Sequence, residues 1–159
     1  MPFLKIDSAL STCKSHLDSL DSTDPSRAEI EAHMVSALVV LIVSEYEELI
    51  ERMFAERADR SGDKRLAQYV RATIAKGFRS PDLSKITKTL GQFGADYKES
   101  FSNVILDTEQ HAAWDNIMKA RHAVVHKSGT LNITLAELLL TYPRTKVVLA
   151  ELKKTLQIA

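Results

Sequence analysis

The sequence is poor in the residues that interrupt helices and in those that cross-link a fold. Its 159 residues include only five glycines, four prolines and one cysteine, Cys13. A single thiol forms no internal disulfide and no multi-cysteine zinc site, which excludes disulfide scaffolds and zinc fingers. Because Gly and Pro are the strongest local breakers of regular structure, their scarcity favours long, uninterrupted elements.

Long hydrophobic runs are missing as well. The longest apolar run is Ala37–Val43, far short of the roughly 20 residues that span a bilayer. Residues 1–5 lack the charged segment and apolar stretch that open a secretory signal. We therefore expect a cytoplasmic protein without a membrane segment.

The formal net charge is zero, but the charges are unevenly distributed. Residues 1–60 contain 12 acids and 6 bases, a net −6, whereas residues 61–159 contain 9 acids and 15 bases, a net +6. Only the second part would attract an anionic partner such as RNA. The basic residues that would steer RNA there are Lys64, Arg65, Arg71, Lys76, Arg79, Lys85 and Lys88. The alternative is that they only solvate two helix faces.

Apolar residues recur at spacings of three and four, and the alternation typical of strands is absent. Helices are predicted over residues 3–20, 25–58, 64–76, 81–92, 95–104 and 108–126. A capping box at Thr134 and Glu137 opens a last unit, which Pro143 is predicted to split into a short helix and a terminal one. We expect one all-α domain over residues 1–159, a bundle of about four principal helices plus short extra helices.

Several common catalytic motifs are absent: a glycine-rich phosphate loop, a GxSxG elbow and an aspartate-rich calcium loop. Of the histidines, only His122 and His126 are close enough in sequence to form a local site. Their four-residue spacing is that of zinc proteases. Ala123 occupies the position where such a protease needs its glutamate, so a zinc hydrolase is a minor alternative and we expect no metal site.

Arg121 and His126 offer a different chemistry. A guanidinium suits a phosphate, and an imidazole, with an ordinary pKa of about 6.5, exchanges protons near neutrality. Together they fit metal-free phosphodiester cleavage. Five residues at about 100° each leave the two side chains about 140° apart on an ideal helix. We therefore expect the helix to loosen at His126, so that the imidazole can turn toward Arg121.

The segment Arg121-His122-x-x-x-His126 resembles the Arg-polar-x-x-x-His signature of HEPN domains, small helical bundles of prokaryotic toxins, phage-defence proteins and RNA-processing enzymes. The flanking residues are similar to the RiboL-PSP-like members of that family. An apolar helix over 39–54 carries the acid Glu47, and a tryptophan-containing helix over 114–126 leads into the motif. Residues 132–134 follow as in those members. The resemblance covers roughly residues 30–157.

The resemblance implies a symmetric homodimer that brings two motifs into one cleft, where RNA is cut without a metal or other cofactor. Arg121 would hold the scissile phosphate and stabilise its developing charge. His126 would activate the ribose 2′-hydroxyl or protonate the leaving oxygen, which yields a 2′,3′-cyclic phosphate. His122 and Glu47 would support this pair.

We therefore predict an endoribonuclease of toxin or phage-defence type, with RNA as substrate and an antitoxin or regulatory protein as a further partner. Lys119 and Lys127 are predicted to bind RNA. The alternative is a non-catalytic RNA- or protein-binding module, in which Arg121 forms a surface salt bridge and His126 is favoured by the helix dipole. The tyrosines predicted to pack, not to stack on bases, are Tyr46, Tyr69 and Tyr97.

Overall fold

The computed structural model describes residues 3–77, 80–126, 131 and 133–158, with the side chains of 75–77 left out. These residues form seven helices and no strand. The helices are α1 (Leu4–Ser19), α2 (Arg27–Asp59), α3 (Lys64–Gly77), α4 (Leu83–Phe93), α5 (Ala95–Ile105), α6 (Glu109–His126) and α7 (Leu135–Thr155). The prediction of an all-α fold is confirmed. Among the described residues, none of the helices has the length and hydrophobicity of a membrane-spanning segment.

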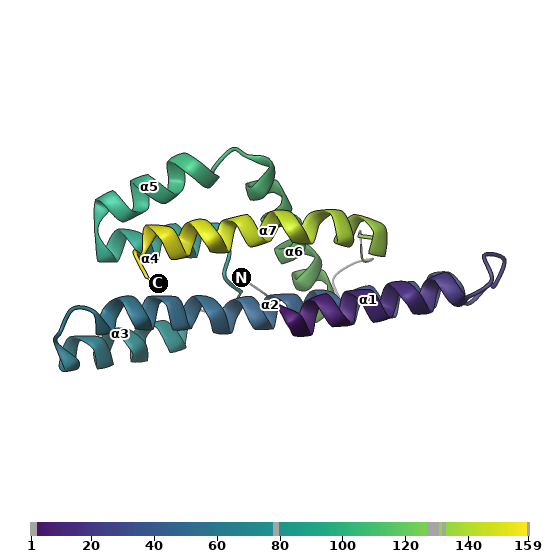
Figure 1. The fold of residues 1–159 in the computed structure, drawn as a ribbon, viewed down its shortest axis with the longest axis horizontal. Helices are drawn as coiled ribbons and strands as arrows, with labels where there is room; N and C mark the ends of the chain where they lie inside the picture. Colours follow the sequence, from purple (N-terminus) through teal and green to yellow (C-terminus); the bar gives the residue numbers. More distant parts are fainter. Residues whose placement is uncertain (1–2, 78–79, 127–130, 132, 159) are drawn as a thin grey trace.

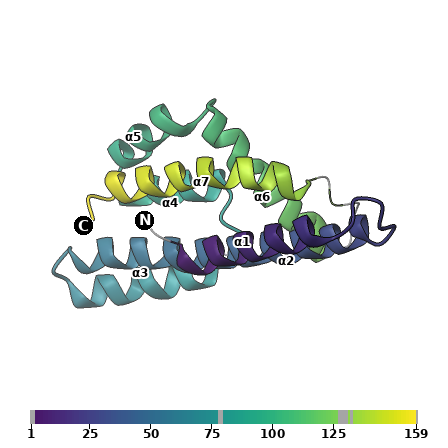
Figure 2. The ribbon, with the colours of Figure 1, turned by 45° about the vertical axis from the view of Figure 1, so that its right-hand side comes forward.

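The helices lie in two layers (Figure 1). In the lower layer α1 and α3 pack along opposite ends of α2, and α4, α5 and α7 lie above them. Helix α6 contacts α2, α4 and α7 and so connects the layers, as the turned view in Figure 2 also shows. The 33 residues of α2 make it about 50 Å long. It contacts α1, α3, α6 and α7 and so lies at the centre of the fold.

The core lies where α2, α6 and α7 meet. Its fully buried members include Val39, Ile42, Val43, Tyr46 and Ile50 of α2, Trp114 and Ile117 of α6, and Leu138, Val148 and Leu152 of α7. Burying one such apolar side chain stabilises a fold by about 1.5–3 kcal/mol. The apolar spacing that predicts helices therefore also determines which faces of α2, α6 and α7 pack against one another.

The predicted capping box at Thr134 and Glu137 is confirmed at the start of α7. The predicted break at Pro143 is wrong, because α7 continues through it. Pro143 lies on the exposed side of the helix, where water can satisfy the carbonyl that loses its N–H partner. Leu138 and Val148, buried on either side of Pro143, hold both halves against the same core.

A polar cluster joins α1 to α7. The carboxylate of Asp7 accepts hydrogen bonds from Tyr142 Oη at 2.9 Å and from Lys146 Nζ at 2.8 Å. The Lys146 ammonium also lies 4.3 Å from the centre of the Tyr142 ring. The bond from Lys146 lowers the pKa of Asp7, the bond from Tyr142 lowers it further, and burial opposes both.

Replacing Asp7 by Asn should lower the free energy of unfolding in a pH-dependent way. A carboxyl whose pKa falls on folding stabilises the fold above its ordinary pKa of 3.8 and loses that contribution as the pH falls through its folded pKa. In urea unfolding, Asp7→Asn should therefore differ from wild type at pH 7, and the difference should shrink below the ordinary pKa.

Asp18→Asn is the matched control, because Asp18 pairs with Lys14 on α1 with both side chains more than half exposed. Exposed pairs of this kind contribute about 0–1 kcal/mol. A loss for Asp7→Asn that is the same at pH 7 and at pH 3 would show that the ionised contacts do not stabilise the fold.

Candidate functional site

Helix α6 presents the three motif residues on two sides. Arg121 is half-buried and turned toward α2, whereas His122 and His126 are exposed. The rings of His122 and His126 lie 4.3 Å apart at an angle of 48°. The two histidines therefore share one face of the helix, as their spacing predicts.

The expected loosening of the helix at His126 is wrong for the described part of this chain, because α6 includes His126 as its last residue. The contact with His122 and the attraction of the helix C-terminus for a basic residue both favour the helical position. Within one chain His126 thus lies about 140° around α6 from Arg121. Lys127, predicted to bind RNA, lies outside the described residues.

The guanidinium of Arg121 contacts two other parts of the chain. Its Nη1 donates to Ser80 Oγ at 2.8 Å, and its Nη2 lies 3.8 Å from Glu47 Oε1. The same Glu47 oxygen accepts from the backbone N–H of Ser80 at 2.6 Å. The side chains of Arg121 and Glu47 are 23% and 22% exposed. The structure therefore brings Glu47, predicted as a supporting residue, to Arg121.

Ser80 is the member of this cluster that the sequence did not reveal. Its φ of 56° is in the left-handed region, where a residue with a side chain costs about 1–3 kcal/mol. All three of its polar groups have partners, since its carbonyl also accepts from Lys85 Nζ at 3.0 Å. In the sequence, Ser80-Pro81 indicates a break between helices, and it says nothing of Arg121.

The buried indole of Trp114 contacts the residues next to Glu47 and Ser80, the two partners of Arg121. Its ring stacks on Tyr46, with centroids 5.2 Å apart and 12° between the planes, and its Nε1–H donates to Pro81 O at 2.9 Å. Tyr46 precedes Glu47 in the chain, and Pro81 follows Ser80. One side chain of α6 therefore positions the backbone beside both partners of Arg121.

Negative charge is concentrated on α2 near this cluster. Burial raises the pKa of Glu51, and the neighbouring carboxylates of Glu47 and Glu48 raise it further. Arg121 lies against this acidic surface and compensates part of it. A phosphate that binds Arg121 must therefore compete with Glu47 for the guanidinium.

The remaining predicted residues lie elsewhere. Lys119 lines a cavity of about 330 Å³ between α6 and α7, beside Ala123 and Glu137 and without Arg121. In the described ranges no group of three or more His, Cys, Asp or Glu side chains is placed to hold a metal ion. A zinc ion bound by His122 and His126 would therefore find no third His, Cys, Asp or Glu ligand in the described part of this chain.

The tyrosines divide into two groups. Tyr46 is fully buried, and Tyr97 is half-buried with the Arg57 guanidinium over its ring, as expected for packing residues. Tyr69 is 69% exposed, so its predicted packing role is wrong. Helix α3 packs on α2, and its buried residues include Ala67 and Ile74, whereas Tyr69 lies outside this buried contact.

Ser80→Ala should destabilise the fold, because it removes a hydrogen bond to a charged group of the kind that contributes about 1.5–3 kcal/mol. Ser80→Gly should cost less, because glycine relieves the left-handed strain. In a thermodynamic cycle with Arg121→Ala, we expect a coupling energy of about 0.5–3 kcal/mol. Ser44→Ala, at an exposed position of α2, is the control. Strict additivity of Ser80→Ala and Arg121→Ala would argue that the contact does not form in solution.

Comparison with a family model agrees with the resemblance to HEPN domains. The family model RiboL-PSP-HEPN matches residues 3–157, nearly the whole chain. Comparison with curated proteins and with solved structures gives no significant match. The match extends over α1 to α7 and so covers the helix that carries Glu47 as well as the one that carries Arg121 and His126. The chain belongs to the RiboL-PSP-HEPN family of HEPN domains.

Proposed function

We propose that this protein is a metal-independent endoribonuclease that acts as a homodimer. The observation that carries the proposal is the placement of Arg121, a half-buried cation held by Glu47 and Ser80, on the same helix as the exposed imidazole of His126. Membership of the HEPN family supports RNA cleavage or RNA binding as the general function.

In the proposed reaction Arg121 binds the scissile phosphate in place of Glu47 and stabilises the charge that develops on it. His126 accepts the proton of the ribose 2′-hydroxyl, and the 2′-oxygen attacks phosphorus. The bond to the 5′-oxygen breaks, and that oxygen takes a proton from solvent or from a second His126. The products are a 2′,3′-cyclic phosphate and a 5′-hydroxyl end.

The separation of Arg121 and His126 around α6 supports a dimeric site. A two-fold axis beside α6 would bring His126 of the partner subunit toward Arg121 and place both copies of His126 in one cleft. We further propose that the enzyme is a cytoplasmic toxin or phage-defence effector controlled by an antitoxin or regulatory protein. We infer that role from the resemblance of the Arg121…His126 motif to the signature of HEPN domains in toxins and phage-defence proteins.

One observation favours a non-catalytic RNA- or protein-binding module as the second candidate. Arg121 is already engaged by Glu47 and Ser80, and the imidazole of His126 lies against His122. If these contacts persist when RNA is bound, the motif positions RNA without cleaving it. A zinc hydrolase using His122 and His126 is the minor alternative.

Cleavage of mixed RNA by the purified protein should persist in EDTA and leave 2′,3′-cyclic phosphate ends. Arg121→Ala and His126→Ala should each lower the rate by about 10²–10⁴-fold, because each removes electrostatic or acid–base assistance. His16→Ala, at an exposed position of α1, should leave the rate unchanged. Activity lost in EDTA would revive the zinc alternative, and RNA binding without any cleavage would favour the binding module.

Mixing the two inactive variants tests whether the site is shared between subunits. A dimer of Arg121→Ala with His126→Ala retains one intact pair if Arg121 acts with His126 of the partner subunit. After equal mixing and subunit exchange, activity should return to at most about a quarter of wild type. Size-exclusion chromatography with light scattering verifies the dimer. A dimer that recovers no activity after exchange contradicts the shared site.

A further inference from the structure

A second hollow, of about 530 Å³, lies between the end of α2, helix α3 and helix α4. One wall is apolar and is formed by Leu66, Tyr69 and Val70 of α3 with Phe93 of α4. Pockets that bind small organic groups have about this volume and this type of wall. The hollow does not include Arg121 or His126, and no part of the proposed reaction uses it.

The wall formed by α3 exposes two large apolar side chains to solvent. The side chain of Leu66 is 49% exposed and that of Tyr69 is 69% exposed, whereas Ala67 on the same helix is buried. On the facing side Phe93 stacks on Phe54, with ring centroids 5.6 Å apart. The hollow therefore has a free aromatic ring on one side and a fixed one on the other.

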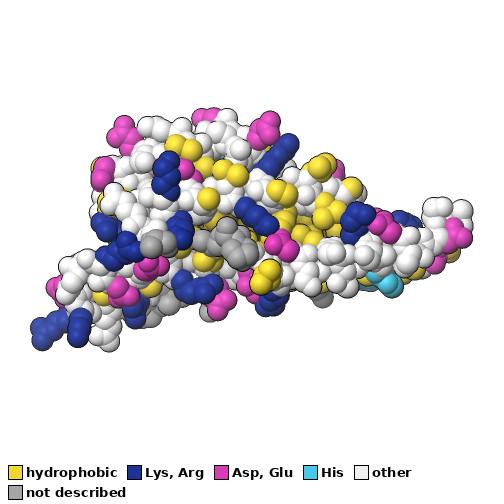
Figure 3. All heavy atoms as spheres, in the orientation of Figure 1, with side chains coloured by type: hydrophobic (Ala, Val, Ile, Leu, Met, Phe, Trp, Pro, Cys, Tyr) yellow, Lys and Arg dark blue, Asp and Glu magenta, His cyan; other side chains and the backbone are white. Residues whose placement is uncertain are grey.

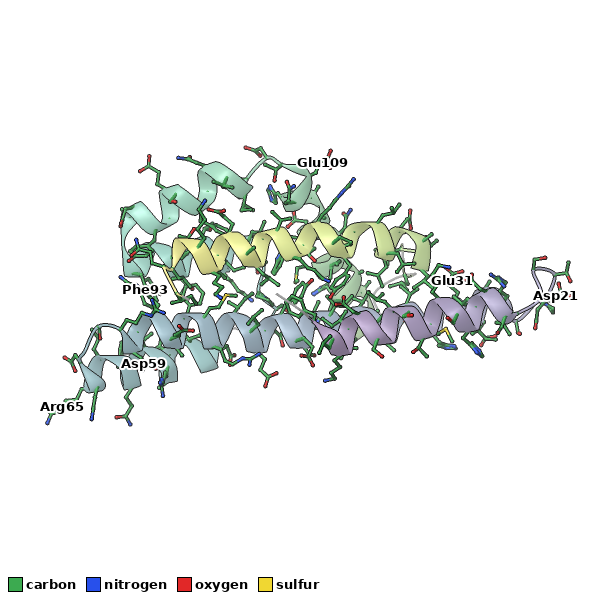
Figure 4. All side chains as sticks on the ribbon, in the orientation of Figure 1. Asp21, Glu31, Asp59, Arg65, Phe93 and Glu109 are labelled. Atoms are coloured by element: carbon green, nitrogen blue, oxygen red, sulfur yellow. The ribbon has the colours of Figure 1, made fainter. Side chains whose placement is uncertain are left out.

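The two charged side chains in the lining of the hollow are both basic. Its lining contains the guanidinium groups of Arg57 and Arg60 and no acidic side chain among the described residues. Arg60 is held by Glu56 and by the carbonyl of Gln157, and Arg57 by Tyr97. Residues 57–99 contain ten Lys and Arg against five Asp and Glu. Lys and Arg side chains lie at this end of the molecule in Figure 3, with Asp and Glu side chains between them, and Figure 4 labels Asp59, Arg65 and Phe93 there.

Helix α4 connects the hollow with the Arg121 cluster. Lys85, in its first turn, donates to the carbonyl of Ser80, and the hydroxyl of the same Ser80 accepts a hydrogen bond from Arg121. Lys88, Thr89 and Gln92 follow at spacings of three and four on the same side of the helix, and Thr89 and Gln92 line the hollow. Lys85 and Gln92 are seven positions apart on the helix, which corresponds to about 10 Å. A basic and polar surface thus leads from Arg121 to Tyr69.

We propose that this hollow binds an unpaired base of single-stranded RNA, with the Tyr69 ring as its stacking platform. The inference rests on the proposed function, because it names a subsite for the same substrate. Bases of single strands stack on exposed aromatic side chains, while Lys and Arg hold the phosphates between them. The hydroxyl of Thr89 and the amide of Gln92 lie in the lining, where they can hydrogen-bond to a base edge.

The observations favour RNA over an apolar protein segment as the occupant. An apolar helix needs a continuous groove, whereas this hollow ends in arginines, a threonine and a glutamine. Its most exposed apolar wall residue is the aromatic Tyr69, and the basic surface of α4 leads from it to the proposed catalytic arginine. A base near Tyr69 and a phosphate at Arg121 would then belong to one strand.

Binding of a fluorescent single-stranded RNA of about 15 nucleotides to the His126→Ala protein provides the test, because cleavage is then suppressed. Tyr69→Ala in that background should raise Kd by about 5- to 150-fold, the usual effect of removing one stacking platform. Tyr69→Phe keeps the ring and should bind as the parent does. Leu140→Ala, at a side chain of α7 that is 70% exposed, controls for loss of an exposed apolar residue.

Substrate length gives a second readout. With His126 intact, Tyr69→Ala should slow cleavage of the long RNA but not of a dinucleotide, which is too short to reach the hollow from Arg121. Unchanged RNA affinity in Tyr69→Ala would overturn the proposal and would favour a protein segment as the occupant of the hollow. An equal loss on both substrates would also overturn it, because Tyr69 would then act through the fold. Tyr69-dependent binding by a wild-type protein that cuts no RNA would refute the nuclease and retain the subsite.

Discussion

The indole of Trp114 is fully buried between α6 and α2, and its contacts fix how the two helices pack. A ring of this size cannot be left out of the core, and its N–H must find an acceptor once it is buried. Both needs are met by neighbours of the functional cluster, since the ring stacks on Tyr46 and the N–H donates to Pro81. The packing of α6 on α2 therefore also sets the distance between Glu47, Ser80 and Arg121.

The cluster around Arg121 combines backbone strain with a partly buried ion pair. Ser80 adopts a left-handed conformation that its own hydrogen bonds to Glu47, Arg121 and Lys85 compensate. Strain of this kind persists where the surroundings determine the conformation, and such places are often functional. Glu47 keeps the guanidinium oriented and paired while no phosphate is bound. In the proposed reaction, RNA exchanges one anionic partner of Arg121 for another, which limits the cost of desolvating the site.

Several features were predictable because they depend on residues close together in the chain. The absence of strand patterns, the helix periods and the Thr134 capping box all depend on local spacing, and the structure agrees with them. The prediction that Pro143 breaks the last helix was wrong. A proline destabilises a helix locally, but the burial of apolar side chains on both sides of Pro143 stabilises the continuous helix more. Tyr69 was misjudged because sequence gives the apolar side of α3 but not how much of that side α2 covers.

Composition and helical period were enough to predict the helical class, and a four-residue spacing was enough to predict that His122 and His126 share a face. The family followed from the resemblance of the Arg121…His126 motif and its flanking residues. Only the tertiary structure decided which acid of α2 meets Arg121, that Ser80 lies between them, and that α6 remains helical at His126. The physical reason is that these contacts join residues far apart in the chain. Their geometry follows from how Trp114 and the core of α2, α6 and α7 pack, which no local pattern specifies.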